Sequence, residues 1–184
     1  MNLLPNLTLI IGGACSGKTK FAENLTLNNG SNNLYIATAE PFDLEMKSKI
    51  DSHQKSRALQ KWKTIEAFHN LAETLEGMKE VKFDTILIDC LTMWLTNKFL
   101  KNKDLPQEVS HLVESIREQK MKVVIVTNEL GYGIVPDNKM AREFRNLNGQ
   151  LNQQIAAESD LVIQVVAGLP CTLKGTLPKA SNDY

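Results

Sequence analysis

The sequence lacks an excess of charge of either sign, because 21 lysine and arginine residues balance 21 aspartate and glutamate residues. Proteins that bind duplex nucleic acid through its phosphates usually carry a basic surface, so this balance argues against nucleic acid as a partner. The chain also lacks any apolar run of the roughly 20 residues that a helix needs to span a bilayer. We therefore expect no membrane span. We expect no signal peptide either, because the apolar residues near the amino terminus lead directly into a glycine loop.

Cysteine is scarce and unpaired in the sequence. The three cysteines, Cys15, Cys90 and Cys171, are widely spaced and form no C-x-x-C pair. This excludes the usual patterns of a disulfide framework or a zinc site and predicts reduced thiols in a cytoplasmic protein. With 184 residues, of which 42% are apolar, we predict a single domain over residues 1–184. Residues 175–184 are polar enough to predict a loose tail.

Short apolar runs alternate with longer amphipathic stretches along the chain. Five runs are apolar on both faces, as in buried parallel strands: 7–11, 34–38, 85–89, 122–127 and 161–166. Helical patterns are predicted at 18–27, 43–58, 107–119 and 138–157. In the last of these, one stripe joins Met140, Phe144, Leu147, Leu151 and Ile155 at steps of three and four. Such alternation predicts an α/β fold with a mostly parallel sheet.

The stretch Gly12-Gly13-Ala14-Cys15-Ser16-Gly17-Lys18-Thr19 matches the phosphate-loop pattern G-x-x-x-x-G-K-[ST] in full. It also has the right context, a predicted strand before it and a predicted helix after it. Glycines in such a loop let backbone N–H groups converge on phosphate oxygens. Lys18 would reach the β- and γ-phosphates, and the Thr19 hydroxyl would bind Mg²⁺. We therefore predict a nucleoside triphosphate site in a P-loop NTPase with a RecA-like sheet and helices on both faces.

Two further positions fit phosphate chemistry. Asp89 ends the strand-like run "TILID", where a second acidic residue would meet the magnesium ion or the loop, although a solvated strand end is the plain alternative. In the predicted helix 43–58, Met46, Ile50, His53 and Arg57 fall on one face, which turns from apolar to polar along its length. From this pattern alone His53 is either structural or catalytic.

Seven segments in series carry a family resemblance. They are "GGACSGKT", "YIATAE", M-x-x-x-I-x-x-H-x-x-x-R over 46–57, W-x-T-x-E at 62–66, "DCLTMWLTN", "VTNELGYGIVP" and "AREFRNLNGQLNQQIA". Over residues 7–174 the chain resembles the bifunctional adenosylcobinamide kinase/adenosylcobinamide-phosphate guanylyltransferase family of cobalamin biosynthesis. The phosphate loop alone is generic, but the ordered series is specific.

The resemblance implies a two-step reaction. A triphosphate, ATP or GTP, phosphorylates the aminopropanol hydroxyl of adenosylcobinamide, and GMP from GTP is then transferred to that phosphate through a histidine–GMP intermediate. His53 would carry the GMP, with Lys18 as the second catalytic residue. Nucleotide contacts would fall on residues 12–19, Ala37, Thr38, Ala39, Gln54, Lys55, Ser56, Arg57, Glu66 and Asp89. The resemblance also implies a homo-oligomer, a trimer.

The chain departs from the family pattern in few places. Family members commonly carry arginine at the position of Cys15, so a cation near the phosphates is absent here, and serine at the position of Thr19, which keeps the hydroxyl. Leu130 and Tyr132 replace a commoner valine and a smaller residue in a loop on the substrate side. In the same loop Asn128 and Glu129 are weaker site candidates.

Two alternatives remain open on sequence alone. One is a P-loop kinase of another small metabolite, in which His53 is only structural. The other is a nucleotide switch or RecA-like module that acts on a macromolecule. A switch GTPase should carry N-K-x-D, and the nearest match, "TNEL", lacks both the lysine and the aspartate.

Overall fold

The computed structural model describes residues 4–44, 62–99, 101 and 104–178. All five predicted strands are confirmed to within one residue at each end. They are β1 (Leu7–Gly12), β2 (Asn33–Ala37), β4 (Thr85–Asp89), β5 (Lys122–Asn128) and β6 (Leu161–Val166). Helix α1 (Lys18–Leu27) has the predicted bounds, α6 (Lys139–Glu158) starts and ends one residue later, and α5 (Leu105–Arg117) starts and ends two residues earlier. The predicted helix 43–58 lies, apart from residues 43 and 44, outside the described residues.

Four elements escaped the prediction. They are β3 (Trp62–Glu66), α3 (Leu71–Gly77), α4 (Leu91–Phe99) and β7 (Leu169–Lys174). Both strands lie at the edges of the sheet and are largely exposed, so they lack the continuous apolar run of a central strand. The two helices have seven and nine residues, too short for a clear helical periodicity.

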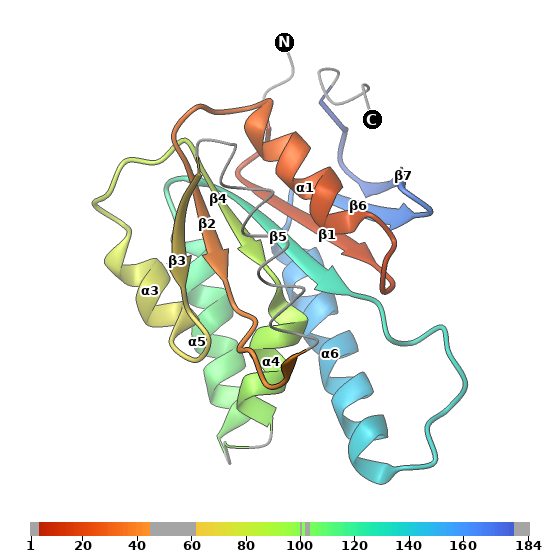
Figure 1. Cartoon of the computed structure of the whole chain (residues 1–184). Coiled ribbons are helices and arrows are strands. Elements are labelled where there is room, and N and C mark those ends of the chain that lie inside the picture. Colours follow the sequence, from red (N-terminus) through yellow and green to blue (C-terminus); the bar gives the residue numbers. More distant parts are fainter. Residues whose placement is uncertain (1–3, 45–61, 100, 102–103, 179–184) are drawn as a thin grey trace.

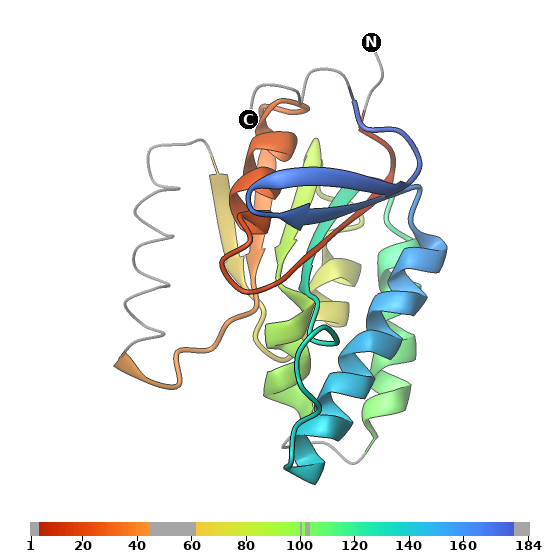
Figure 2. The same cartoon turned by 90° about the vertical axis from the view of Figure 1, so that its right-hand side faces the viewer.

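One seven-stranded sheet organises the described residues, in the order β3-β2-β4-β5-β1-β6-β7. Every neighbouring pair is parallel except β6 and β7, which form an antiparallel hairpin at one edge. Figure 1 shows α1 in front of the sheet and α3, α4, α5 and α6 behind it, and the two layers are separated in Figure 2. The predicted α/β architecture with helices on both faces is confirmed.

The apolar core is divided into two layers by the sheet. Because side chains alternate along a strand, Val123 and Ile125 of β5 pack on the side of α4, α5 and α6, whereas Val124 and Val126 pack on the side of α1. The continuous apolar runs of the sequence therefore reflect burial on both faces. The same alternation fixes the face on which each polar residue at the end of a strand emerges.

The buried face of helix α6 differs from the predicted apolar stripe in which residues it buries and in its polarity. Met140, the first residue of the predicted stripe, is 50% exposed and lies in the first turn of the helix. Further along, the buried face contains Asn148 and Asn152 beside Leu151 and Ile155. The stripe is thus partly polar where it faces the end of β5.

The carboxyl-terminal segment is packed as far as it is described. Leu177 packs against the core layer beneath α1, and Pro178 is buried. The expected loose tail therefore does not begin at residue 175, because an apolar side chain at 177 docks on the fold. Residues 179–184 lie outside the described residues.

The β6–β7 hairpin turns on only two residues, Ala167 and Gly168. Both have positive φ, 52° and 79°, which is the pattern of a type I′ turn and which alanine adopts only under strain. We expect Ala167→Asn to raise the free energy of unfolding by about 0.5–1 kcal/mol, because asparagine tolerates this conformation better. Urea unfolding measures the change. Ala167→Val should lower stability, and a destabilised Ala167→Asn variant would contradict the turn geometry.

Candidate active site

The phosphate loop connects the end of β1 to the start of α1. Gly17 precedes the helix with a φ of 91° and Cys15 has a φ of 54°, so the chain passes twice through the left-handed region before the helix begins. Alternation of right- and left-handed residues makes successive N–H groups converge on one point, which is the geometry of an anion nest. Lys18 lies over the loop, and its Nζ donates to the carbonyl oxygen of Gly13 at 3.0 Å.

Backbone contacts from the β6–β7 hairpin and from the residue that follows β5 support this loop. The Gly168 N–H, from the β6–β7 turn, donates to the Ser16 carbonyl at 2.8 Å, and the Glu129 N–H donates to the Gly12 carbonyl at 3.0 Å. A Cβ atom on Gly12 would meet Ser16 Oγ and lie 2.7 Å from the carbonyl oxygen of Val165, and one on Gly17 would lie 3.1 Å from Gly168 Cα. Gly12 and Gly17 are therefore required by close approach, and Gly17 also by its conformation.

The predicted residues from the other strands lie at the same carboxyl edge of the sheet as this loop. Ala37 pairs in register with both Glu66 and Asp89, so these three residues form one row across β3, β2 and β4. The carboxyl ends of parallel strands are the usual place for ligand sites in open α/β sheets. The structure thus places Ala37, Glu66 and Asp89 together, on the far side of β5 from the phosphate loop.

Asp89 is held by a neighbouring tyrosine. The Tyr35 hydroxyl donates to Asp89 Oδ2 at 2.6 Å, and by strand alternation both side chains emerge on the face that α1 covers. Burial, followed by the negative charge of Asp89, raises the pKa of the adjacent Cys90 thiol to about 12, while the positive charge of Lys18 acts in the opposite direction. Cys90 is therefore a neutral core thiol, and it lies within the electrostatic reach of both Lys18 and Asp89.

The segment after β2 is fixed by buried hydrogen bonds. The Thr38 hydroxyl donates to the Cys90 carbonyl and accepts from the Cys90 N–H, both at 2.7 Å. Asn97 Nδ2 donates to the carbonyl oxygens of Thr38 and Phe68, both at 2.8 Å. Thr38 is wholly buried, so its side chain positions the strand ends, whereas its neighbours Ala37 and Ala39 are half-buried.

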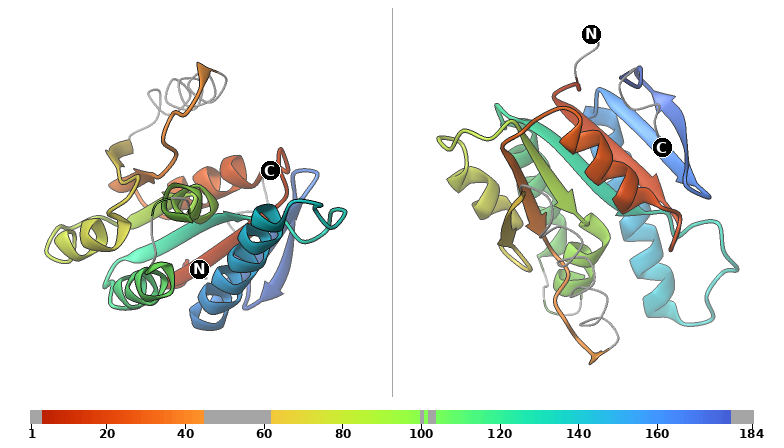
Figure 3. Two further views of the ribbon diagram at one scale, coloured as in Figure 1. Left: turned by 90° about the horizontal axis from the view of Figure 1, so that it is seen from below. Right: turned by 45° about the horizontal axis from the view of Figure 1, so that its top comes forward.

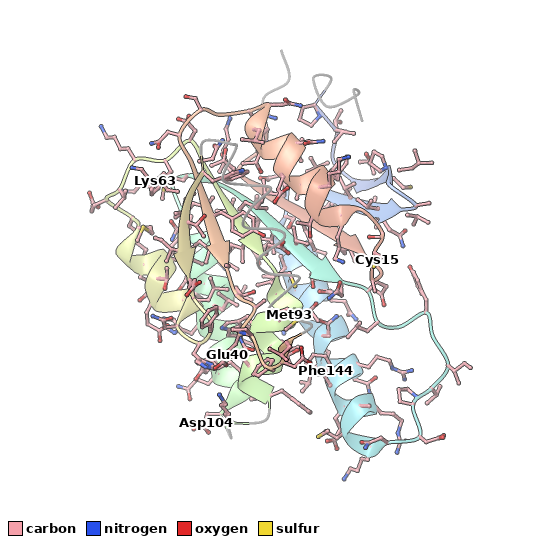
Figure 4. The ribbon with its side chains drawn as sticks, in the orientation of Figure 1. Cys15, Glu40, Lys63, Met93, Asp104 and Phe144 are labelled. Carbon is pink, nitrogen blue, oxygen red and sulfur yellow. The ribbon has the colours of Figure 1, made fainter. Side chains whose placement is uncertain are left out.

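Several predicted site residues fall outside this description. His53, Gln54, Lys55, Ser56 and Arg57 lie outside the described residues, and their predicted roles stay predictions. Within the described part, Cys15 is exposed at the phosphate loop, as Figure 4 shows. Glu40, labelled in the same view, follows β2 in the chain. Its Oε2 lies 3.3 Å from His69 Nε2 and 3.8 Å from Lys101 Nζ.

The sequence analysis missed the polar cluster behind the end of β5. It consists of Thr92, Thr127, Asn148 and Asn152, all buried. The signal was present in the sequence, because Asn148 and Asn152 fall four residues apart between the apolar positions of α6.

Arg142, also on α6, holds the end of the β5–α6 connection. Its Nη1 donates to the carbonyl oxygens of Pro136 and Asp137 at 2.8 and 2.7 Å.

The strand, glycine-rich loop and helix, set in a mostly parallel sheet with an acidic residue two strands away, define a P-loop NTPase with a RecA-like sheet. Within that class the chain belongs to one family. Residues 8–173 match the family model described as cobinamide kinase/cobinamide phosphate guanyltransferase. The predicted family resemblance and the predicted class of enzyme are confirmed.

Relatives of known name cover nearly the same length. The bifunctional adenosylcobalamin biosynthesis protein CobP of Pseudomonas aeruginosa is 40% identical, over 91% of this chain and 96% of its own. The corresponding protein CobU of Escherichia coli K12 is 34% identical, over 91% of this chain and 99% of its own.

Solved structures agree on the fold alone. The RadB recombinase has a TM-score of 0.50 at 14% identity, covering 89% of this chain and 76% of its own. An ATPase from a bacterial type III secretion system has a TM-score of 0.52 at 11% identity, covering 96% of this chain and 60% of its own. Among the described helices of the present chain, none has the length and apolar character to cross a membrane.

The contacts around Gly12 yield a stability test of the loop. We expect Gly12→Ala to lower the free energy of unfolding by about 1–3 kcal/mol, because the added methyl group overlaps the Ser16 side chain and the Val165 carbonyl. Gly13→Ala is the matched control, since a Cβ atom there meets nothing within 4 Å. Urea unfolding without nucleotide compares the two. Equal stability of both variants would mean that the loop does not pack against β6 as described.

Proposed function

We propose that this protein phosphorylates the aminopropanol hydroxyl of adenosylcobinamide and then transfers GMP from GTP to the new phosphate, releasing pyrophosphate. The observation that carries the proposal is a phosphate loop with Lys18 in a chain whose residues 8–173 match the family model for both activities. A P-loop kinase of another small metabolite would share the loop but not the family match. The neutral net charge likewise gives no support to a module that acts on nucleic acid.

In the phosphorylation step the loop holds the triphosphate and the acceptor hydroxyl attacks the γ-phosphorus. The bond to the β-phosphate oxygen breaks as the new ester bond forms, and the hydroxyl proton leaves to a base or water. Lys18 stabilises the charge on the phosphate oxygens, and the converging N–H groups of the loop hold them in place. ATP or GTP serves this step.

Mg²⁺ fits the residues at this site as a partner of the triphosphate. The Thr19 hydroxyl at the start of α1 and the Asp89 carboxylate would hold it, and Tyr35 engages only one carboxylate oxygen of Asp89. Hydroxyl, carboxylate and phosphate oxygens are the ligands that Mg²⁺ prefers, so a cluster of three acidic side chains is not needed. When bound, the ion neutralises charge on the phosphates.

In the guanylyl step we propose that His53 is the nucleophile. A ring nitrogen of His53 attacks the α-phosphorus of GTP, the bond to the β-phosphate oxygen breaks, and pyrophosphate leaves. The phosphate of the corrinoid then attacks the same phosphorus and breaks the P–N bond, which restores His53. Arg57, one helical turn further along the predicted helix, would neutralise the transferring group and disfavour the imidazolium form.

We propose nucleotide contacts on both sides of β5. They comprise residues 12–19, Ala37 to Ala39, Gln54 to Arg57, Glu66 and Asp89. The register that brings Ala37, Glu66 and Asp89 into one row supports a continuous nucleotide site along the carboxyl edge. We propose that the protein assembles as a homo-trimer, which the family resemblance supports. We also propose that it lies in the cytoplasm, which its three free cysteines support.

The β5–α6 connection offers a surface for the corrin ring. Tyr132, Ile134 and Val135 are 83%, 96% and 59% exposed, beside the phosphate loop that Glu129 contacts. Figure 3 shows the connection next to the β6–β7 hairpin, where Gln164 Nε2 donates to the Tyr132 hydroxyl at 3.3 Å. Exposed apolar side chains at a site are typical of a ligand with apolar surface, and a corrin macrocycle offers a conjugated ring with methyl substituents.

The test of the proposed function separates its two steps. With ATP and adenosylcobinamide, the wild type should form the phosphate ester, and with GTP added it should form adenosylcobinamide-GDP. GTP labelled at the α-phosphate should label the protein with an adduct that is stable in alkali and labile in acid, as a phosphoramidate is. His53→Ala should lose the adduct and guanylyl transfer but keep phosphorylation, because that step uses the loop and the acceptor hydroxyl. Mass spectrometry and scintillation counting follow products and label.

Two controls give this test its meaning. GTP labelled at the γ-phosphate should leave no label on the wild type, since that phosphate departs in pyrophosphate. His69→Ala, which removes a histidine outside the proposed chemistry, should keep the adduct. An undiminished adduct in His53→Ala would place the nucleophile elsewhere, and a wild type that ignores cobinamide but phosphorylates another metabolite would refute the proposal.

The corrin surface is tested by making it polar. Ile134→Ser should raise the KM for adenosylcobinamide about five- to twentyfold, because an exposed isoleucine loses the apolar contact that it makes only with ligand. The Kd for GTP should not change. Val81→Ser is the control, since Val81 is 41% exposed between α3 and β4, before the amino end of β4. If Ile134→Ser alters the oligomeric mass and not the KM, the surface is a subunit contact.

A further inference from the structure

The end of β5 is fastened by the buried polar cluster of Thr92, Thr127, Asn148 and Asn152. The Thr92 hydroxyl accepts from the Asn128 N–H at 2.8 Å, and the side-chain amides of Asn148 and Asn152 donate to the Asn128 carbonyl at 2.8 and 3.1 Å. Both backbone groups of Asn128 are therefore held by side chains from two helices, α4 and α6.

The cluster also holds itself together. Thr92 Oγ1 donates to Asn148 Oδ1 at 2.9 Å, Thr127 Oγ1 donates to Asn152 Oδ1 at 2.8 Å, and the two hydroxyl oxygens lie 3.2 Å apart. Burying four polar side chains is costly unless they are satisfied, and a satisfied network fixes a position more tightly than apolar packing does. Apolar side chains would dock α6 at lower cost, so the arrangement points to a need for a fixed Asn128.

The side chain of Asn128 emerges on the opposite face, toward the phosphate loop. Thr127 faces α4 and α6, so by alternation Asn128 follows Val124 and Val126 onto the side of α1. Asn128 also pairs in register with Gly12, the first residue of the phosphate loop. Its side chain is half-buried, and within the described residues the hydrogen bonds of Asn128 go to its backbone and none to its side-chain amide.

We propose that the Asn128 side-chain amide donates a hydrogen bond to the γ-phosphate of the bound triphosphate. The inference rests on the proposed function for the identity of the ligand. The loop and Lys18 hold the phosphates from the side of β1 and α1, Asp89 lies on β4, and Asn128 stands on the strand between them. A neutral donor at that point binds a phosphate oxygen without competing with a magnesium ion.

The two reactions should use this contact differently. In phosphorylation the γ-phosphoryl group is the one transferred, so a donor to its oxygens is needed as the charge on them redistributes. In guanylyl transfer the same phosphate is the far end of the leaving pyrophosphate. There the contact serves binding far more than chemistry.

Nucleotide binding gives the first test, and it does not need catalysis. Calorimetry compares GDP with a GTP analogue in which a methylene group bridges the β- and γ-phosphates. In the wild type the analogue should bind more tightly than GDP. In Asn128→Ala the ratio of the Kd for GDP to the Kd for the analogue should shrink about tenfold or more, because one hydrogen bond to a charged group is lost. The Kd for GDP itself should change little. Asn128→Asp, of the same shape but charged, should reverse the preference.

Kinetics give the second test. Asn128→Ala should lower the kcat of phosphorylation about tenfold or more and should act on guanylyl transfer mainly through the KM for GTP. Asn146→Ala is the matched control, because Asn146 is an exposed asparagine on α6 outside the cluster. Urea unfolding should show near-native stability for Asn128→Ala, since the backbone bonds of residue 128 remain.

The outcomes separate this inference from the proposed function. If Asn128→Ala keeps the full preference for the GTP analogue, the amide does not contact the γ-phosphate, whatever the enzyme acts on. If GDP and the analogue lose affinity equally, Asn128 shapes the whole site and the γ-phosphate contact is refuted. A wild type that binds GTP with the expected preference but ignores cobinamide would refute the proposed function and leave this contact standing.

Discussion

The structure depends on the close approach of backbone to backbone around the phosphate loop. Gly12 lies against the Val165 carbonyl, and Gly17 lies against Gly168, where a side chain would not fit. The Gly168 N–H holds the Ser16 carbonyl outward at 2.8 Å. Because C=O and N–H point in opposite directions across a trans peptide, this bond turns the Gly17 N–H inward, toward a ligand. The hairpin at the edge of the sheet thereby helps to organise an anion site that it does not itself line.

The parallel sheet converts this local geometry into a complete site. Gly12 pairs in register with Asn128, and Ala37 pairs with Glu66 and Asp89. All five residues therefore lie at the same edge of the sheet. The position of each group along that edge is set by strand order, so the loop and Asp89 are separated by β5. In the proposed function the triphosphate spans that separation, and the end of β5 would then face its outer phosphate.

The sequence predicted the parts of the fold whose physics is local or repetitive. Strands that are buried on both faces have continuous apolar runs in the sequence, and the phosphate loop has its glycines at fixed spacing. For this reason β1, β4 and α1 were predicted to within a residue. The edge strands β3 and β7 were missed because partners on one side only leave no continuous apolar pattern. The roles of Tyr35, Asn148 and Asn152 were also missed, because each depends on a partner 20 to 54 residues away that no local spacing reveals.

One triphosphate site can serve two displacements only if the nucleophiles reach different phosphorus atoms of a nucleotide held in one way. The phosphate loop fixes the β- and γ-phosphates, so an attack on the γ-phosphorus must come from beyond the loop, on the side of the exposed β5–α6 connection. An attack on the α-phosphorus must come from the other side, because the pyrophosphate then leaves into the loop. Strands β2 and β3, between which His53 falls in the sequence, lie on that other side of β5. In the proposed mechanism the corrinoid hydroxyl and His53 would therefore approach opposite ends of the same triphosphate, and the loop would not need to rearrange between the two steps.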